Sequence, residues 1–405
     1  MPYESNIPDD LEETKTKAWR EKLKYDIENH LSSLRLPNND GDEDSEQPSK
    51  QAIRVSHMKQ RIELFDHERE KLSKYWDEMP ENFANGKEVN PEKIEPELEI
   101  VDSQGYSGFV FRYASLLWSV PVSKGYGRRI RYLVKDKQNG KLIGLFALND
   151  PVFNLSARDS WIGWSTEDRK EHLVHVMDAY VVGAVPPYSY LLGGKLITSL
   201  IGSSEVSEYF SEKYRDTRGI ISHKKKEPKL ALVTITSALG RSSIYNRLKL
   251  VNQTEYPNDD ANTEVIVELI KIGETKGYGH FHLSNGLFER IKLMLAAEDH
   301  KYAGGHQYGD GPNWRFRVIR VGLDKLGLSK DVLRHGIKRE IYGMPLCEDF
   351  RSFLTGKIKE PTISRPTASE IAHHAKIRWM IPRSRNHQDY QQFLYQDIEK
   401  MITPY

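Results

Sequence analysis

AYVVGAVPPYSYLLGGK, residues 179–195, is the segment that most clearly sets the fold class of this chain. Residues 179–185 form a short apolar run that ends at Pro186-Pro187, which is typical of a buried strand. A turn follows, and residues 191–195 open a segment whose helical periodicity extends to about residue 209. Because a buried strand followed directly by a helix is a building unit of α/β sheets, the stretch predicts an α/β core.

The segments on either side of this stretch fit the same core. Residues 129–136 and 142–148 are β-rich and are separated by a turn that contains Asn139-Gly140, which predicts a β-hairpin. Ser165 has the character of a helix N-cap. Further strands are expected at 230–236, 263–272 and 279–283, and a short helix at 242–250. We therefore predict a mixed sheet flanked by helices over residues 96–285.

The two ends of the chain differ from this core. Residues 1–95 are predicted to be helical, with an acidic disordered linker near 37–50. An apolar stripe from Ile53 to Trp76 could pack on the body of the protein or on a partner helix. Residues 286–405 are predicted to be a helical and basic C-terminal region, with helices at 287–297, 313–326, 330–337 and 369–379.

Composition limits the class of protein. The net charge of +1 gives no global field, so any nucleic-acid site must be a local patch. The single cysteine excludes an intramolecular disulfide, and no histidine pair has the further ligands that a zinc site needs, so we expect no metal. No signal peptide and no long apolar run is visible, so we expect a cytoplasmic location without a membrane span.

A helix that begins directly after a buried strand offers free backbone amides to an anion. In this respect the segment resembles the pyrophosphate site of GNAT acyltransferases, which implies that Val185, Gly193, Gly194 and Lys195 could hold acetyl-coenzyme A. Tyr190 stands where GNAT enzymes carry Arg or Gln, and Lys195 replaces a small residue. The alternative is that the two glycines only allow close packing.

No general base stands out for such a transfer. Three acidic residues lie in the right part of the chain, and each is equally well explained as a capping or surface acid. They are Glu167, Asp168 and Asp178. The sequence therefore leaves open whether the GNAT-like core is catalytic.

A basic stretch over residues 309–342 is the strongest candidate for contact with nucleic acid. Its cations can gather on one face, and an aromatic ring could stack on unpaired bases. The candidate residues there are Trp314, Arg315, Arg317, Arg320, Arg334, Lys338 and Arg339. Arg128 and Arg129, at the start of the hairpin, form a smaller basic group. The alternative is a charged helix pair that is simply solvated.

Several distinctive segments together resemble a known family. They are LWSVPVSKGYGRR at 117–129, DPVFNL at 150–155, WIGWS at 161–165, GYGHF at 277–281, GPNWR at 311–315, LRHGIKRE at 333–340 and RWMIPR at 378–383. The chain is similar over residues 98–395 to the DruA-like family, which is associated with some Druantia anti-phage systems.

This resemblance implies a role in bacterial defence against phage, beside other Druantia proteins that include a helicase-like subunit. Some relatives are described as transposase-like, which points towards nucleic acid. Three hypotheses follow: a subunit that binds nucleic acid or partner proteins through a non-catalytic GNAT-like fold, an acyl-coenzyme A-dependent N-acyltransferase, and a structural adaptor or oligomerisation subunit.

Overall fold

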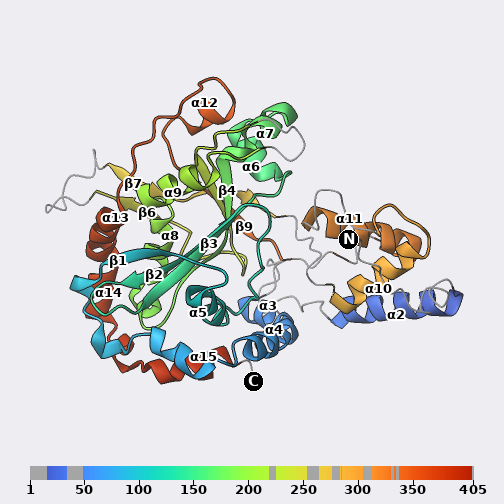
Figure 1. The fold of residues 1–405 in the computed structure, drawn as a ribbon, viewed down its shortest axis with the longest axis horizontal. Helices are drawn as coiled ribbons and strands as arrows, with labels where there is room; N and C mark the ends of the chain where they lie inside the picture. Colours follow the sequence, from blue (N-terminus) through green and yellow to red (C-terminus); the bar gives the residue numbers. More distant parts are fainter. Residues whose placement is uncertain are drawn as a thin grey trace. The chain divides into compact units, whose positions relative to one another are not determined.

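The computed structural model of the chain describes residues 16–33, 49–218, 225–252, 264–275, 283, 285–303, 312–329, 333 and 337–403 (Figure 1). The chain divides into two compact units. Unit 1 combines Met1–Ser56 with Thr275–Lys338, and unit 2 combines His57–Glu274 with Arg339–Tyr405. The predicted linker near 37–50, the predicted strand at 279–283 and most of the predicted helix at 330–337 lie outside the described residues.

Unit 2 is built on a seven-stranded mixed sheet with the order β1-β2-β3-β4-β5-β9-β8. The strands are β1 (Pro96–Ile100), β2 (Arg129–Asp136), β3 (Leu142–Asn149), β4 (Val176–Ala184), β5 (Leu232–Thr236), β8 (Ile270–Glu274) and β9 (Glu340–Pro345). Strands β4 and β5 are parallel, and every other neighbouring pair is antiparallel. A separate two-stranded sheet pairs β6 (Lys249–Val251) with β7 (Val265–Glu268). The prediction of a mixed α/β sheet is confirmed.

Helices pack on the two faces of this sheet. The α-helices of unit 2 are α4 (Met58–Lys71), α5 (Tyr106–Ser115), α6 (Ser156–Ile162), α7 (Thr166–His172), α8 (Gly193–Leu200), α9 (Ser204–Tyr214), α12 (Phe350–Leu354), α13 (Ala368–Ala375), α14 (Ile381–Asn386) and α15 (Ile398–Ile402). Shorter helical turns are η1 (Trp76–Asn82), η2 (Gly86–Glu88), η3 (Pro91–Lys93), η4 (Leu173–His175), η5 (Tyr188–Leu191), η8 (Asp389–Gln392) and η9 (Tyr395–Asp397), and α13 continues as the π-helix Lys376–Met380.

Two apolar layers hold the sheet because side chains alternate between its faces. On one face, Phe146 and Met177 pack in the same cluster as Leu196 of α8 and Ile371 of α13. On the other face, the sheet packs against α4, η1 and α5 through a second cluster that includes Phe65 and Trp76. The second half of the predicted apolar stripe therefore packs on the body of its own unit.

Unit 1 is a helical unit with its own core. Its helices are α2 (Lys17–Ser33), α3 (Lys50–Ser56), α10 (Asn285–Ala296) and α11 (Pro312–Lys325). Leu23 and Ile27 of α2 pack with Ile291 of α10 and with Val318 and Ile319 of α11. Each of these three helices presents an apolar stripe to this core, which is the usual way that short helices stabilise one another.

The hairpin, the β4 strand, β5 and the helix at 369–379 confirm the predictions for those segments. At the hairpin turn Gly140 has a φ of +71°, which a glycine adopts without strain. Ser165 caps α7 in a capping box with Asp168, as the sequence indicates.

Three predictions of local structure are wrong. The helix expected to reach about residue 209 is two helices, because Ser203 takes an extended conformation and begins α9. The helix expected at 242–250 is a series of turns that ends in β6, with Arg247 at a φ of +66°. The strand expected at 263–272 is divided between β7 and β8, which belong to different sheets.

Candidate functional site

The two glycines that follow β4, Gly193 and Gly194, are packed closely against neighbouring atoms of the chain. A Cβ at Gly193 would lie 2.6 Å from the carbonyl oxygen of Tyr188, and one at Gly194 would lie 2.9 Å from Cδ1 of Ile244. Val185 is fully buried, and the ammonium group of Lys195 lies 5.0 Å from the centre of the Trp379 ring. The chain's own atoms therefore lie close against both glycines and leave no room for a side chain at either position. This geometry favours the packing explanation, and acetyl-coenzyme A binding here stays a prediction.

Arg128 is a structural residue of unit 2. Its Nε donates to Oδ1 of Asp150 at 2.7 Å, and its Nη1 donates to the carbonyl oxygen of Val174 at 2.8 Å. Its guanidinium carbon lies 5.4 Å from the ring centres of both Phe210 and Tyr214. Because its N–H groups already donate to these oxygens and its guanidinium group lies near two rings, this side chain is poorly placed to meet a phosphate.

Arg129, the neighbour of Arg128, points to solvent. Its Nη1 donates to the carbonyl oxygen of Lys124 at 3.3 Å. This bond leaves other donors of the guanidinium free to contact an anion. Of the two hairpin arginines that the sequence suggested, only Arg129 is exposed.

Trp314 belongs to the core of unit 1. Its side chain is 7% exposed, and its ring makes an edge-to-face contact with Phe288 at 5.8 Å between ring centres. Arg315 is half-buried, with its guanidinium carbon 4.1 Å from the centre of the Phe288 ring. Burial lowers the pKa of Arg315 from its usual value. In this structure neither side chain offers the surface that contact with unpaired bases or phosphates needs.

Arg317 and Arg320 lie on the exposed side of α11, three residues apart. Among the described residues neither has an ion-pair partner, whereas the Arg20, Arg290 and Lys325 side chains of the same unit are paired with acids. Since residues three apart on a helix are neighbours on its surface, the two guanidinium groups form a local cationic site.

The other candidates in the basic stretch that the structure describes are less accessible. Arg334 lies outside the described residues. Lys338 is half-buried, and burial lowers the pKa of Arg339 to about 10. Of all the candidates in this stretch that the structure describes, only Arg317 and Arg320 are brought together as exposed cations on one helix.

A buried ionic network in unit 2 was not predicted from the sequence. Arg158 of α6 is fully buried, and its Nη2 donates to Oδ1 of Asp159 at 2.6 Å. Oδ2 of Asp159 accepts from Nη1 of Arg169 at 2.7 Å. Basic and acidic residues lie close together in the sequence around 158–169, which is a signal for such a network. The burial of the network depends on the sheet behind it, which this segment alone does not reveal.

Asp178 of β4 borders this network. Its Oδ1 accepts from Thr234 of β5 at 2.8 Å, across the parallel strand pair. Burial raises the pKa of the Asp178 carboxyl to about 6, and the Thr234 hydrogen bond and the charge of Arg158 oppose this rise. Of the three acids considered from the sequence, Asp168 caps α7 and Glu167 pairs with Lys170 at the surface. The Asp178 side chain is half-buried, on a strand inside unit 2.

We expect Asp178→Asn to stabilise unit 2 near pH 7. A carboxyl whose pKa is raised from 3.8 to about 6 by folding destabilises the folded state as pH rises through that interval. The amide can keep the Thr234 bond and carries no charge, so the difference in unfolding free energy between variant and wild type should grow with pH by up to about 3 kcal/mol. Urea denaturation at several pH values between 4 and 7 measures it. A pH-independent difference would contradict this expectation.

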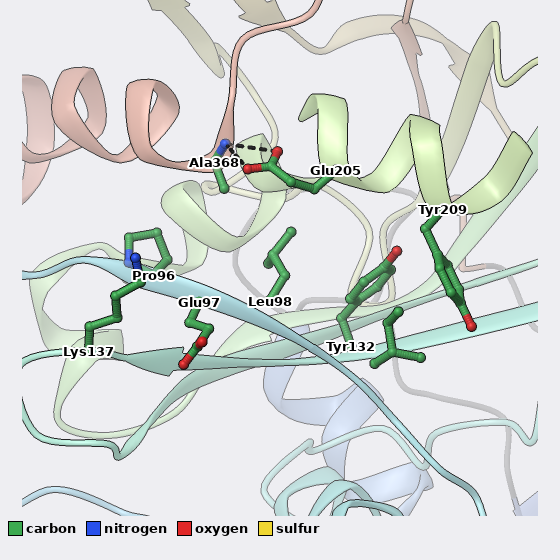
Figure 2. Close-up of a pocket in the computed structure, with 9 residues that line it drawn as sticks. Pro96, Glu97, Leu98, Tyr132, Lys137, Glu205, Tyr209 and Ala368 are labelled. Carbon is green, nitrogen blue, oxygen red and sulfur yellow. Dashed lines mark hydrogen bonds between the residues drawn. The ribbon is translucent and has the colours of Figure 1, made fainter. Parts of the chain in front are cut away.

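A hollow of about 270 Å³ lies beside strand β1 (Figure 2). Pro96, Leu98 and Ile100, which share one face of β1, lie along it. Glu205 and Tyr209 of α9 border it, and the backbone N–H of Ala368 at the start of α13 donates to both carboxylate oxygens of Glu205, at 2.9 and 3.0 Å. The other lining residues are Glu97, Tyr132 and Lys137.

Two structural findings bear on the expectations about membranes and metals. Within the described ranges, no helix is long and apolar enough to cross a membrane. Over the same part of the chain, no group of three His, Cys, Asp or Glu side chains is arranged so that it could hold a metal ion.

Comparison with known proteins finds a family that matches this chain. A profile of the family described as "Druantia protein DruA" matches residues 47–356. A protein named "Druantia protein DruA" from Escherichia coli (strain UMEA 4076-1) is 44% identical over 384 residues, which cover 94% of this chain and 92% of that protein. No solved structure matches the chain, so the GNAT-like label receives no support from known structures.

Proposed function

The chain belongs to the DruA family of Druantia proteins, and on that basis we propose that it is a component of a bacterial anti-phage system in which unit 1 contacts DNA. The family supports the role in the system, and the exposed arginines of α11 support the contact. Other subunits of the same system, including the helicase-like protein that the resemblance implies, are the expected partners.

One observation carries the contact with DNA. Along α11, Trp314, Val318 and Ile319 face the core, while Arg317 and Arg320 face solvent without an acidic partner among the described residues. Exposed guanidinium groups bind phosphate oxygens in pairs of parallel hydrogen bonds and release counterions as they do so. Because the net charge of the chain is only +1, this local site would supply the attraction that the whole protein lacks.

A plaque assay tests the proposal in cells. Cells that carry the complete defence locus are compared with cells that carry Arg317→Glu/Arg320→Glu in this chain, and with cells that lack the gene. We expect the double variant to lose most of the protection, because a reversed charge repels phosphate. Lys50→Glu/Arg54→Glu, on an exposed part of α3, is the matched control and should protect like the wild type. Full protection by the α11 variant would exclude this site, and full protection without the gene would exclude the role in defence.

A further inference from the structure

Strand β1 is an outer strand of the seven-stranded sheet, and within the described residues its second edge is not paired with a strand. The backbone N–H of Val101 donates to the carbonyl oxygen of Arg131 at 2.9 Å, which fixes the alternation of the ladder with β2. In an antiparallel pair every second residue directs its N–H and C=O towards the partner strand. Leu98 and Ile100 therefore direct theirs away from β2, towards the open edge.

This edge is protected only in part. Outer strands are commonly protected by proline or by charged side chains, because free N–H and C=O groups invite pairing with another chain. Here Pro96 stands at the first position and Glu97 and Glu99 carry charges, with Glu99 paired to Lys135, whereas Ile100 is 40% exposed. The next two outward N–H groups belong to Leu98 and Ile100, two of the residues that line the hollow.

Tyr132, one of the residues that line the hollow, has a hydroxyl that the described chain does not satisfy. Tyr132 is 1% exposed, and its hydroxyl has no hydrogen-bond partner among the described residues. Figure 2 shows this hydroxyl pointing from the sheet towards the side on which α9 lies. A buried hydroxyl without a partner destabilises a fold, and such groups are rare enough in native proteins to require an explanation.

The surroundings of this hydroxyl combine a carboxylate and aromatic rings with two cations, since Lys137 lines the hollow and Nζ of Lys213 lies 5.4 Å from the centre of the Tyr209 ring. The ring of Tyr209 meets that of Tyr132 edge to face, with 6.2 Å between their centres. The carboxylate of Glu205 accepts the Ala368 N–H with both oxygens, and its Oε2 also accepts from the Ser204 hydroxyl, so Oε1 has capacity for a further donor. Aromatic rings beside a carboxylate form a favourable environment for an ammonium or guanidinium group.

We propose that the β1 edge binds an extended, basic segment of a partner protein as an added strand, with a lysine or arginine side chain of that segment in the hollow. The backbone of the segment would bond to the outward groups of Leu98 and Ile100. Its cation would reach the carboxylate of Glu205 and, by displacing the side chains that cover it, the hydroxyl of Tyr132. This inference goes beyond contact between unit 1 and DNA, since every residue that it uses belongs to unit 2.

A second copy of this chain fits the edge less well. An antiparallel pair of β1 strands centred on Leu98 would place Glu97 of each copy opposite Glu99 of the other. Like charges directly opposite one another in a sheet are destabilising. A basic segment would instead place a cation opposite Glu97, while Glu99 is already paired with Lys135. Charge therefore favours a basic partner over self-association.

Selection from a library of random extended peptides on the full-length protein, without nucleic acid, tests the proposal. We expect the selected peptides to be enriched in lysine or arginine with β-branched residues two positions away, since alternate side chains of a strand share one face. A selection that yields no binder, or binders without basic residues, would overturn the proposal. Equal binding of free lysinamide would assign the hollow to a small amine and would overturn it as well.

Three variants test whether the selected peptides bind at the β1 edge and in the hollow. Tyr132→Phe removes only the unpartnered hydroxyl, so it should bind the selected peptides several-fold more weakly while its thermal stability is unchanged or higher. Glu205→Gln should weaken binding about tenfold, because the amide can still accept from Ala368 but carries no charge. Leu98→Pro removes an outward N–H that the ladder with β2 does not use, and should also weaken binding.

The control is Glu208→Gln, an exposed position of α9 that does not line the hollow. It should bind the peptides like the wild type. Unchanged binding in Tyr132→Phe and Glu205→Gln would contradict the placement of the cation, and unchanged binding in Leu98→Pro would contradict strand addition. Binding of DNA by the α11 arginines is measured separately, so failure of either proposal leaves the other distinguishable.

Discussion

Asp159→Ala is expected to destabilise unit 2 by about 3–5 kcal/mol, the usual result of removing one partner from a buried ion pair. Asp159 accepts from Nε and Nη2 of Arg158 and from Nη1 of Arg169. Arg158 is 0% exposed, so its charge would remain in the interior with only the carbonyl oxygens of Val152 and Phe153 as acceptors. Urea denaturation followed by tryptophan fluorescence measures the change in unfolding free energy.

Glu167→Ala is the matched control for this variant. It also removes one acid from an ion pair, with Lys170, but both side chains are mostly exposed. Exposed pairs contribute little, so we expect a change within about 0.5 kcal/mol. If Asp159→Ala behaved like Glu167→Ala, the network around Arg158 would not be the structural centre that its burial indicates.

Arg317→Ala/Arg320→Ala is expected to weaken DNA binding roughly tenfold or more at constant salt. The change removes two exposed cations without opening the core of unit 1, because Val318 and Ile319 are untouched. Fluorescence anisotropy with a labelled duplex measures the affinity. Lys50→Ala/Arg54→Ala removes the same charge from α3 and should bind nearly as the wild type does. An equal reduction in both variants would indicate a non-specific charge effect in place of a site on α11.

Local sequence signals predicted part of the fold well. The Asn139-Gly140 turn placed the hairpin, and the apolar run before Pro186 placed β4, because turn chemistry and short apolar runs act over few residues. The same kind of local signal bears on one wrong prediction, the single helix expected to reach about residue 209. Gly202-Ser203 is a helix stop followed by an N-cap, and with attention to this pair the break between α8 and α9 could have been predicted.

Strand β9 could not be predicted in this way. Residues 340–345 lie between β5 and β8, and their burial comes from strands more than 60 residues away in sequence. A short run with a glycine and a proline gives a weak strand signal by itself. Its partners exist only once the chain has folded.

In the candidate site, too, some features could be predicted from the local sequence and others could not. The period of α11 could have assigned Trp314 to the core, since Val318 follows four residues later on the same face. The enclosure of Arg128 between Phe210 and Tyr214 could not be predicted, because those rings come from a helix far along the chain. The unsatisfied hydroxyl of Tyr132 likewise depends on packing between distant segments.

Anisotropy of the full-length wild-type protein with labelled single- and double-stranded DNA, across a salt series, decides whether the exposed arginines of unit 1 contact DNA. We expect binding at low salt, with an affinity whose logarithm falls linearly with the logarithm of the salt concentration. The slope should become shallower by up to roughly 0.9 for each phosphate that Arg317→Ala/Arg320→Ala no longer neutralises. No binding at low salt, or the same slope in the double variant as in the wild type, would contradict a DNA contact at these arginines.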